Sequence, residues 1–217
     1  KQKRKSEMKA LQAQINPHFL YNTLDSIIWM SEAGENDQVV LMTSALAKLL
    51  RQSISNDREQ ITVAEEIDYV RSYLTIQKMR YKDKLEYTID VEERILDVRI
   101  IKFVLQPLVE NAIYHGLKYK ETKGNLDIRG YRRGNRVCLV VADDGAGMEE
   151  SELEHILEKK EKKTKSNGVG VYNVQKRLQL YYGPEYGISY ISRKGEGTVA
   201  TVTIPLDGGK SNEETGR

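Results

Sequence analysis

Glycine is distributed very unevenly along this chain of 217 residues, which contains 16 glycines. The first 82 residues hold one glycine, Gly34, and one proline, Pro17. Because these residue types are the strongest helix breakers, a segment almost free of them favours long helices, whereas the glycine-rich remainder must turn often. The spacing predicts a helical region over residues 1–82, a region of mixed strands and helices over 83–207, and a disordered tail at 208–217.

Three helices are expected in the N-terminal region. The first covers Met8 to Ser31 and the second Val40 to Ile54, with a loop around Gly34 between them. The third starts with a capping box, in which Thr62 is the N-cap and Glu65 follows three residues later. Because a short connection makes two helices antiparallel neighbours, the first two should form a hairpin.

Strand and helix patterns are mixed over residues 83–207. Alternating or β-rich segments predict strands at 85–91, 126–131, 137–142, 187–192 and 198–204. Apolar residues at helical spacing predict helices at 100–117 and 169–182, and the segment 148–167 is polar and rich in lysine. We therefore expect an α+β protein, in which a helical hairpin precedes an α/β sandwich.

Charge and cysteine content exclude several classes of protein. The chain has 34 basic and 32 acidic residues and a net charge of +2, so nothing favours a dedicated nucleic-acid binder, and we expect no nucleic-acid partner. The single cysteine, Cys138, excludes an intramolecular disulfide and a multi-cysteine zinc site and fits a reducing compartment. No apolar run approaches the roughly 18 residues that indicate a membrane span.

Two glycine motifs in the C-terminal region have the character of a nucleotide site. Asp143 ends a predicted strand, Gly145 and Gly147 follow it, and an acidic group there can accept a hydrogen bond from a purine amine. Gly168 and Gly170 open a predicted helix, where free N–H groups and the helix dipole favour phosphate. Taken alone, the first motif more often marks an ordinary tight turn, and the second can be a glycine N-cap.

Polar residues interrupt the apolar helix expected at 100–117. Asn111 and His115 are four residues apart and share a helix face. An inward asparagine needs partners, and a hydrated magnesium ion bridging phosphates is a suitable one, although a buried structural asparagine explains the residue equally well. A further glycine turn, Gly195-Glu-Gly-Thr198, precedes the last strand and in isolation reads as a hairpin loop.

The order of these sites resembles the N, G1, G2 and G3 boxes of the GHKL superfamily of ATP-binding domains (gyrase, Hsp90, histidine kinase, MutL), over about residues 83–206. The segment Leu11-Gln-Ala-Gln-Ile-Asn-Pro-His-Phe-Leu-Tyr-Asn-Thr-Leu24 is similar to the phosphoacceptor box of LytS/YesM-type sensor histidine kinases. Leu105–Ile113 and Gly168–Leu178 are similar to the N and G2 boxes of that family. The resemblance therefore spans nearly the whole chain.

The resemblance implies a role for each matching residue. His18 is the phosphoacceptor, Asp143 contacts the adenine N6 and Asn111 binds magnesium. The remaining nucleotide-binding positions are Gly145, Gly147, Gly168, Gly170, Thr198 and His115. Asn22, one turn after His18, is suited to orienting the imidazole ring. Which group of the nucleotide His115 contacts stays open, as do the roles of Glu110, Asn173 and Arg177, and packing or helix capping can explain the last two.

Some positions depart from the family pattern. Many histidine kinases have an acidic residue directly after the phosphoacceptor, whereas Phe19 follows His18 here, so the proton acceptor is not identified. Pro107 stands where ATP-hydrolysing members carry the water-activating glutamate, which suits transfer to histidine rather than to water. On a helical wheel, His18 lies at the edge of the apolar stripe that includes Leu11 and Ile15, which predicts partial exposure. Either solvation or contacts to ATP phosphates can explain the lysines of the presumed lid, Lys159, Lys160, Lys162, Lys163 and Lys165.

The resemblance implies a two-component sensor histidine kinase that uses ATP and Mg²⁺ to phosphorylate His18 and passes the phosphoryl group to an aspartate of a response regulator. It also implies a homodimer, in which two hairpins form a four-helix bundle. We expect the cytoplasmic portion of a bacterial membrane protein, anchored only through upstream segments. Two other classes stay open: a GHKL ATPase machine, against which Pro107 argues, and a nucleotide-binding module with degenerate catalysis, against which the intact glycine boxes argue.

Overall fold

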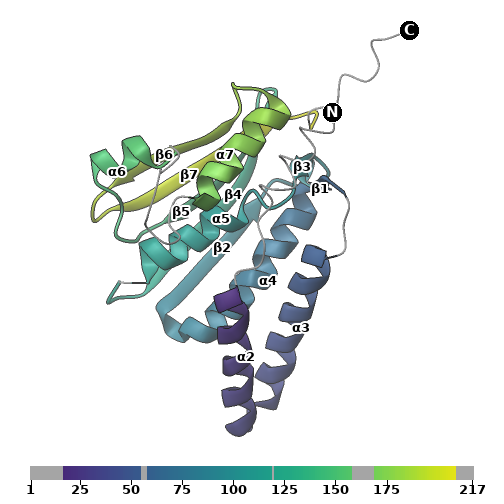
Figure 1. Ribbon diagram of the computed structural model, residues 1–217, viewed down its shortest axis with the longest axis vertical. Helices are drawn as coiled ribbons and strands as arrows, with labels where there is room; N and C mark the ends of the chain where they lie inside the picture. Colours follow the sequence, from purple (N-terminus) through teal and green to yellow (C-terminus); the bar gives the residue numbers. More distant parts are fainter. Residues whose placement is uncertain (1–16, 55–57, 119, 158–168, 209–217) are drawn as a thin grey trace.

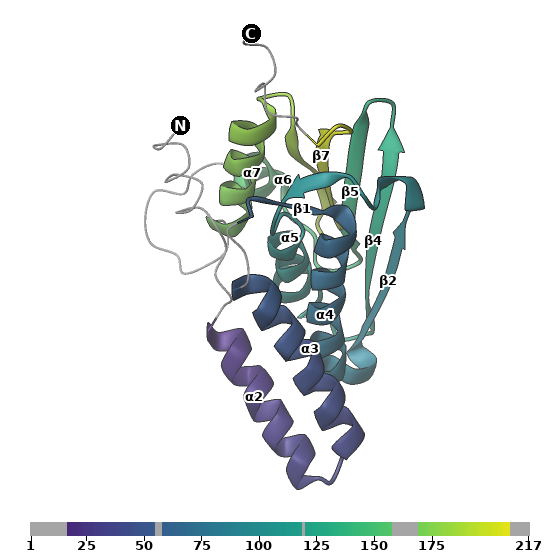
Figure 2. The ribbon, with the colours of Figure 1, turned by 90° about the vertical axis from the view of Figure 1, so that its right-hand side faces the viewer.

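The N-terminal region folds into a helical hairpin. The computed structural model describes residues 17–54, 58–118, 120–157 and 169–208. Helix α2 covers Pro17–Glu32 and helix α3 covers Asn36–Ile54, and the two run antiparallel (Figures 1 and 2). Gly34 turns the chain between them with a φ of 75°, a backbone conformation in which glycine avoids a Cβ clash. The predicted hairpin is confirmed, and the part of the expected first helix before Pro17 lies outside the described residues.

Helix α4, Val63–Tyr81, begins with the predicted capping box. The Thr62 hydroxyl accepts a hydrogen bond from the Glu65 amide at 3.1 Å, and the Glu65 carboxylate accepts one from the Thr62 amide at 2.8 Å. The predicted apolar stripe of Ile67, Val70 and Leu74 is buried. The two capping bonds satisfy amides that have no partner within the helix itself, so the start of α4 is well defined.

A five-stranded sheet forms the second layer, and all five predicted strands are confirmed. The strands are β2 Leu85–Val91, β4 Gly124–Arg133, β5 Arg136–Asp143, β6 Gly187–Arg193 and β7 Gly197–Pro205. Their order is β2-β4-β5-β7-β6, with β2 and β4 parallel and the other neighbours antiparallel. Helices α4, α5 (Gln106–Asn111) and α7 (Val169–Tyr182) cover one face of this sheet (Figure 2). Short 3₁₀ turns, Lys82–Lys84 and Glu93–Ile95, flank β2.

The helix predicted at 100–117 is wrong in its first part. Strand β3, Arg99–Ile101, pairs antiparallel with strand β1, Gln60–Thr62, and α5 begins only at Gln106. Pro107 explains the late start, because proline is tolerated in the first turn of a helix but not in its interior. The short helix α6, Glu150–His155, was also not predicted, since the segment looked only polar.

The two layers share one core. A single cluster of buried apolar side chains extends from Phe19 of α2 to Ile204 of β7, and α4 lies between the hairpin and the sheet. The observed architecture is α+β, as predicted. At the C-terminal end, the Gly208 carbonyl accepts a hydrogen bond from the Gln60 side chain at 2.8 Å, and residues 209–217 lie outside the described part. Among the described residues, no helix is both long and apolar enough to cross a membrane.

Candidate active site

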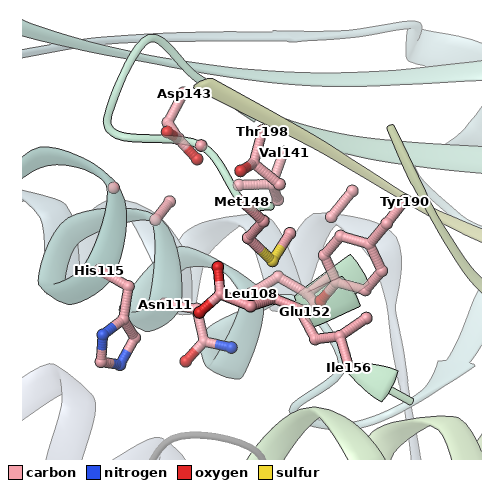
Figure 3. Close-up of a pocket in the computed structure, with 14 residues that line it drawn as sticks. Leu108, Asn111, His115, Val141, Asp143, Met148, Glu152, Ile156, Tyr190 and Thr198 are labelled. Carbon is pink, nitrogen blue, oxygen red and sulfur yellow. The ribbon is translucent and has the colours of Figure 1, made fainter. Parts of the chain in front are cut away.

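A cavity of about 330 Å³ lies between α5 and the end of β5 (Figure 3). It brings together five of the residues predicted to bind nucleotide: Asn111, His115, Asp143, Gly147 and Thr198. Most of the other lining residues are apolar and were not predicted: Leu108, Ala112, Gly116, Val141, Met148, Glu152, Ile156, Tyr190 and Ala200. Apolar walls combined with a few converging polar groups are usual in small-molecule sites, and this cavity has both kinds of lining.

Asp143 gives this cavity its buried acidic group. The pKa of its carboxyl group is raised to about 6, mainly by burial; the Gly145 amide, which donates to Oδ1 at 2.9 Å, opposes this rise, and the charge of the neighbouring Asp144 adds to it. At neutral pH the side chain is therefore mostly ionised although it is largely removed from water. A hydrogen-bond donor that enters the cavity stabilises such a carboxylate, and the amine of a purine is one such donor.

The glycines after Asp143 allow the loop to pack directly on the helix opposite. A Cβ at Gly145 would lie 2.1 Å from the carbonyl oxygen of Gly116, and the Ala146 amide donates to that same oxygen at 3.0 Å. Gly147 has a φ of 64°, and a Cβ there would lie 2.0 Å from the Arg193 carbonyl oxygen. Both glycines are therefore required sterically. A Cβ at Gly116 would lie 2.5 Å from Oδ1 of Asp143, so this glycine leaves room for the buried carboxylate.

Thr198 belongs to a polar cluster rather than to a simple hairpin loop. Its hydroxyl lies 2.9 Å from that of Ser192, which donates to the Gly197 carbonyl at 2.8 Å and accepts from the Met148 amide at 3.0 Å. Gly197 has a φ of 93°, and a Cβ there would lie 2.0 Å from the Asp143 carbonyl oxygen. The glycine turn thus ties the last strand to the loop after Asp143, and Ser192 was missed because strand pairing alone brings it there.

Asn111 and His115 lie side by side at the edge of the cavity (Figure 3). Beyond Asn111 the helix continues as a π-helix, Ala112–Leu117, in which the Lys118 amide donates to the Ile113 carbonyl at 2.9 Å. Such widened turns are frequent at functional sites. Burial, followed by the charge of Lys118, lowers the pKa of His115, so its imidazole is neutral at pH 7 and can accept as well as donate a hydrogen bond.

The Asn111 amide offers one oxygen ligand to a cation. The described residues hold no group of three or more histidine, cysteine, aspartate or glutamate side chains suited to a metal ion. Magnesium, however, usually keeps several waters and binds through one or two protein oxygens together with substrate phosphates. The residues present therefore fit a magnesium ion that is held mainly by a nucleotide.

His18 is exposed in the first turn of α2, as the helical wheel predicts. The Asn22 amide nitrogen lies 3.2 Å from each nitrogen of the His18 ring. Phe19 points the other way: it is buried, and its ring lies 5.0 Å from that of Tyr73 on α4. The residue after His18 is therefore a packing anchor that leaves the imidazole facing outward.

Other predicted residues lie away from the cavity or outside the description. Gly170 is exposed at the start of α7, where a Cβ would make an ordinary contact with Pro107 at 3.5 Å. Glu110 accepts a hydrogen bond from the Gln106 side chain at 2.8 Å, and burial raises its pKa. Arg177 is buried and donates to the Lys102 carbonyl. Gly168 and the five lysines between 159 and 165 lie outside the described residues.

Comparisons with known proteins agree with this arrangement. Residues 96–208 match the family "Histidine kinase-, DNA gyrase B-, and HSP90-like ATPase", and residues 6–85 match the family "Histidine kinase". The chain is 39% identical over 202 residues to the sensor histidine kinase YesM of Bacillus subtilis, which covers 93% of this chain and 34% of YesM. It is 33% identical over 207 residues to the sensor protein LytS of Oceanobacillus iheyensis, over 93% of this chain and 35% of LytS. The chain thus spans about a third of the length of these relatives.

A solved structure shows the same fold. The histidine kinase domain of the blue-light activated histidine kinase EL346 from Erythrobacter litoralis aligns with a TM-score of 0.53 and 15% identity. The alignment covers 96% of this chain and 98% of that domain. Hairpin and sheet together therefore have a counterpart in a single known domain.

Proposed function

The chain belongs to the histidine kinase-, DNA gyrase B- and HSP90-like ATPases and, among them, to the sensor histidine kinases of the YesM and LytS type; on this basis we propose that it phosphorylates itself on His18 with ATP and passes the phosphoryl group to an aspartate of a response regulator. The observation that carries the proposal is the cavity, which unites Asp143, Asn111 and the glycine turns, combined with an exposed histidine on a separate helix of the same core.

In this proposal, different residues of the cavity contact the adenine and the phosphates of the nucleotide. Asp143 accepts a hydrogen bond from the adenine amine, and the apolar lining, including Val141 and Met148, holds the ring. Asn111 would lie toward the phosphates, where its amide oxygen would hold magnesium. A magnesium ion there would neutralise phosphate charge, which is its usual contribution to phosphoryl transfer. The protein itself positions the γ-phosphoryl group and keeps water from the adenine.

His18 is the nucleophile in this scheme. A neutral imidazole nitrogen attacks the γ-phosphorus, an N–P bond forms, the bond to the bridging oxygen of ADP breaks, and the ring gives its remaining proton to the solvent to which His18 is exposed. Asn22 can hold the ring for this step. The oxygen and nitrogen of its amide are nearly indistinguishable by shape, and with the oxygen facing the imidazole it can accept a hydrogen bond from the ring N–H, so that the nitrogen without the proton is the one that attacks.

We propose that the protein dimerises through the hairpin, whose exposed apolar side chains support this. Tyr21, Leu24 and Ile28 of α2 and Val40 and Leu41 of α3 are large apolar side chains that are exposed in a single chain. A second copy that packs its hairpin against this face would bury both sets in a four-helix bundle. A response regulator would then reach His18 from outside the bundle. The chain spans about a third of the length of its relatives. We propose that this region lies in the cytoplasm, where ATP and a response regulator are present, and that other parts of a longer protein attach it to the membrane.

Labelling with γ-³²P ATP and Mg²⁺ tests the proposal. We expect acid-labile, alkali-stable label on the wild-type protein and none on His18→Gln, while fluorescent ATP analogues bind both proteins equally. His155→Gln is the matched control among the three histidines and should keep its label. Label that survives in His18→Gln refutes the site. Repeated release of phosphate without stable label would instead favour an ATPase machine.

A further inference from the structure

Three charged residues outside the nucleotide cavity are buried, and two of them, Glu66 and Arg177, interact through their charges. Glu66 of α4 is 0% exposed, Lys102 before α5 is 4% exposed and Arg177 of α7 is 1% exposed. Burying a charge costs several kcal/mol unless the charge is paired and hydrogen-bonded. The hydrogen bonds that Glu66 and Arg177 make show which part of the backbone these buried charges stabilise.

Glu66 holds the backbone that leads into α5. Its Oε2 accepts a hydrogen bond from the Phe103 amide at 2.9 Å, and its Oε1 accepts one from the Leu105 amide at 2.8 Å. Leu105 is the N-cap residue of α5, and Phe103 has a φ of 60°, a strained conformation for a residue with a large side chain. The carboxylate of one helix thus accepts hydrogen bonds from two amides at and just before the N-cap of another, and it stabilises the strained turn at Phe103.

Arg177 completes the cluster from a third element. Its Nη2 donates to the Lys102 carbonyl at 2.5 Å, and its charge opposes the rise in the pKa of Glu66 that burial causes. Both residues therefore hydrogen-bond to the backbone of the same stretch, 102–105. That stretch is joined directly to α5, which carries Asn111 only six residues after Leu105.

We propose that Glu66 and Arg177 are positioning residues that set the start of α5 and thereby place Asn111 for magnesium-dependent nucleotide binding. Six residues of helix are too short to absorb a displacement at their start, so a shift at Leu105 moves Asn111 as well. Helix α4 also packs against α3 of the hairpin, so Glu66 links the helical layer to the cavity. The inference rests on the proposed magnesium role of Asn111.

Nucleotide binding with and without magnesium separates positioning from general stability. We would measure the affinity for a fluorescent ATP analogue in Mg²⁺ and in EDTA for the wild-type protein, Glu66→Gln and Asn111→Ala. We expect Glu66→Gln to lose about tenfold in affinity with Mg²⁺ and less than twofold in EDTA. Asn111→Ala should show the same pattern, and the double variant should lose no more than Asn111→Ala alone, because both changes remove one interaction.

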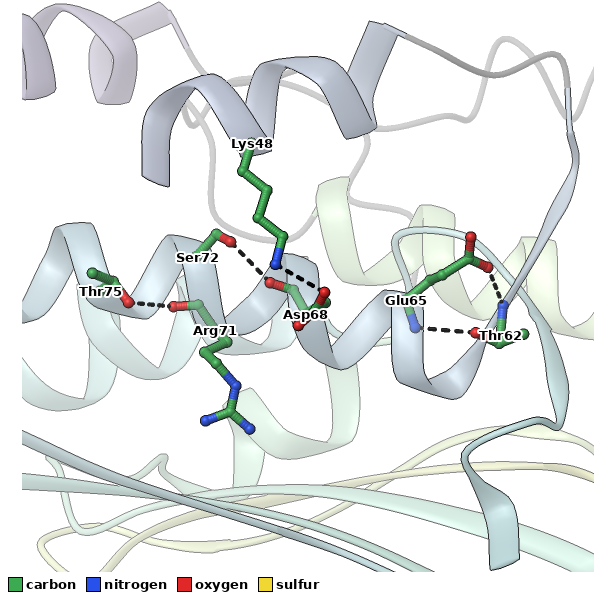
Figure 4. A network of polar contacts seen from close by, with 7 residues as sticks. All are labelled: Lys48, Thr62, Glu65, Asp68, Arg71, Ser72 and Thr75. Atoms are coloured by element: carbon green, nitrogen blue, oxygen red, sulfur yellow. Dashed lines mark hydrogen bonds and ion pairs between the residues drawn. The ribbon is translucent and has the colours of Figure 1, made fainter. Parts of the chain in front are cut away.

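Asp68→Asn is the matched control on the same helix. Asp68 pairs with Lys48 at 2.8 Å on the surface, so its change from carboxylate to amide should alter neither affinity by more than twofold (Figure 4). Arg177→Lys is the milder second variant, to be used if circular dichroism shows that Glu66→Gln is unfolded, and it should show the same dependence on Mg²⁺.

Three results would decide against parts of the scheme. If Glu66→Gln loses the same affinity with Mg²⁺ as in EDTA, Glu66 and Arg177 have only a role in folding, and the inference is overturned. Unchanged binding in a folded Glu66→Gln and in Arg177→Lys would overturn it as well. If Asn111→Ala itself shows no dependence on Mg²⁺, the proposed magnesium site fails, and that result is distinct from a failure of Glu66 alone.

Discussion

The hairpin and the sheet region differ in how completely they bury their large apolar side chains. Within the described residues, most of the large exposed apolar side chains lie on α2 and α3, whereas the strands and helices of the sheet region bury theirs in one core. The sheet region also builds the cavity from its own residues. The hairpin buries one face against α4 and leaves the other open. The sheet region is thus complete within one chain, while the hairpin has the surface of a protein that assembles.

The largest effect should follow from placing a charge on the open face of the hairpin. Ile28 is 54% exposed in the single chain, and Ile28→Asp would bury two carboxylates in a two-fold interface. We expect the dimer to weaken by roughly 100-fold or more, about 2.7 kcal/mol, as measured by analytical ultracentrifugation. Binding of ATP analogues should be unchanged.

Ile191→Asp is the corresponding change in the sheet region. Ile191 is 75% exposed on the edge strand β6, away from the hairpin, so the same substitution there should leave the dimer intact. A dimer that survives Ile28→Asp but dissociates on Ile191→Asp would reverse the comparison and place the interface on the sheet.

Asp143→Asn should have a smaller effect, limited to the sheet region. The loss of a charged acceptor should weaken nucleotide binding by about 10- to 100-fold at pH 7.5. Wild-type affinity should also fall as the pH drops through about 6, the raised pKa of this carboxyl group, whereas the affinity of the variant should be flat in that range. Isothermal titration calorimetry across this range measures both quantities.

Asp143→Asn should also stabilise the nucleotide-free protein. Because the pKa of Asp143 rises from 3.8 to about 6 on folding, the folded state disfavours the charged form, so wild-type stability falls as the pH rises from about 4 to about 6 and stays lower above that. Asn has no such cost. We expect Asp143→Asn to be more stable at pH 8 by on the order of 1–2 kcal/mol, after allowance for partial exposure, and equal near pH 4. A variant that is less stable at pH 8 would show that the carboxylate is structurally required.

Local sequence patterns predicted those helices and caps that are determined by residues close together in the chain. The hairpin, the Thr62 capping box and the bounds of α7 were expected because helix periodicity and capping act within a few residues. Strands β1 and β3 were missed because three-residue strands show no periodicity, and Gln60 meets Ile101 only through tertiary folding. Glu66 and Arg177 were likewise not recognised as partners, since a charged residue in an amphipathic helix is usually solvated.

In the candidate site, too, some residues could be identified from the sequence and others only from the structure. Asn111, Asp143 and Thr198 were identified by motif order and family resemblance, and the structure brings them to one cavity. Ser192 and Gly116 were not identified, because strand register and the packing of one backbone on another decide their contacts. Sequence therefore predicts which residues the site contains more readily than which residues support it.

The smallest expected effect concerns α4, which joins the two regions. Thr62→Ala removes one capping bond and should lower the free energy of unfolding by about 1 kcal/mol. The first turn keeps two backbone bonds, from Val63 to Val98 and from Ala64 to Leu96, so dimerisation and nucleotide affinity should stay within twofold. Thr75→Ala, which removes an exposed bond to the Arg71 carbonyl in the same helix, is the control and should cost nothing, because alanine is the better helix former (Figure 4).

Two probes then show whether the regions unfold together. Trp29, the only tryptophan, lies on α2 and reports on the hairpin, whereas circular dichroism reports on both regions. Since one core runs through α4, the two unfolding curves should coincide in the wild-type protein and shift equally in Thr62→Ala. If the Trp29 transition instead stays in place while the circular dichroism transition shifts, the hairpin is stabilised independently of α4, and the link through Glu66 loses its physical basis.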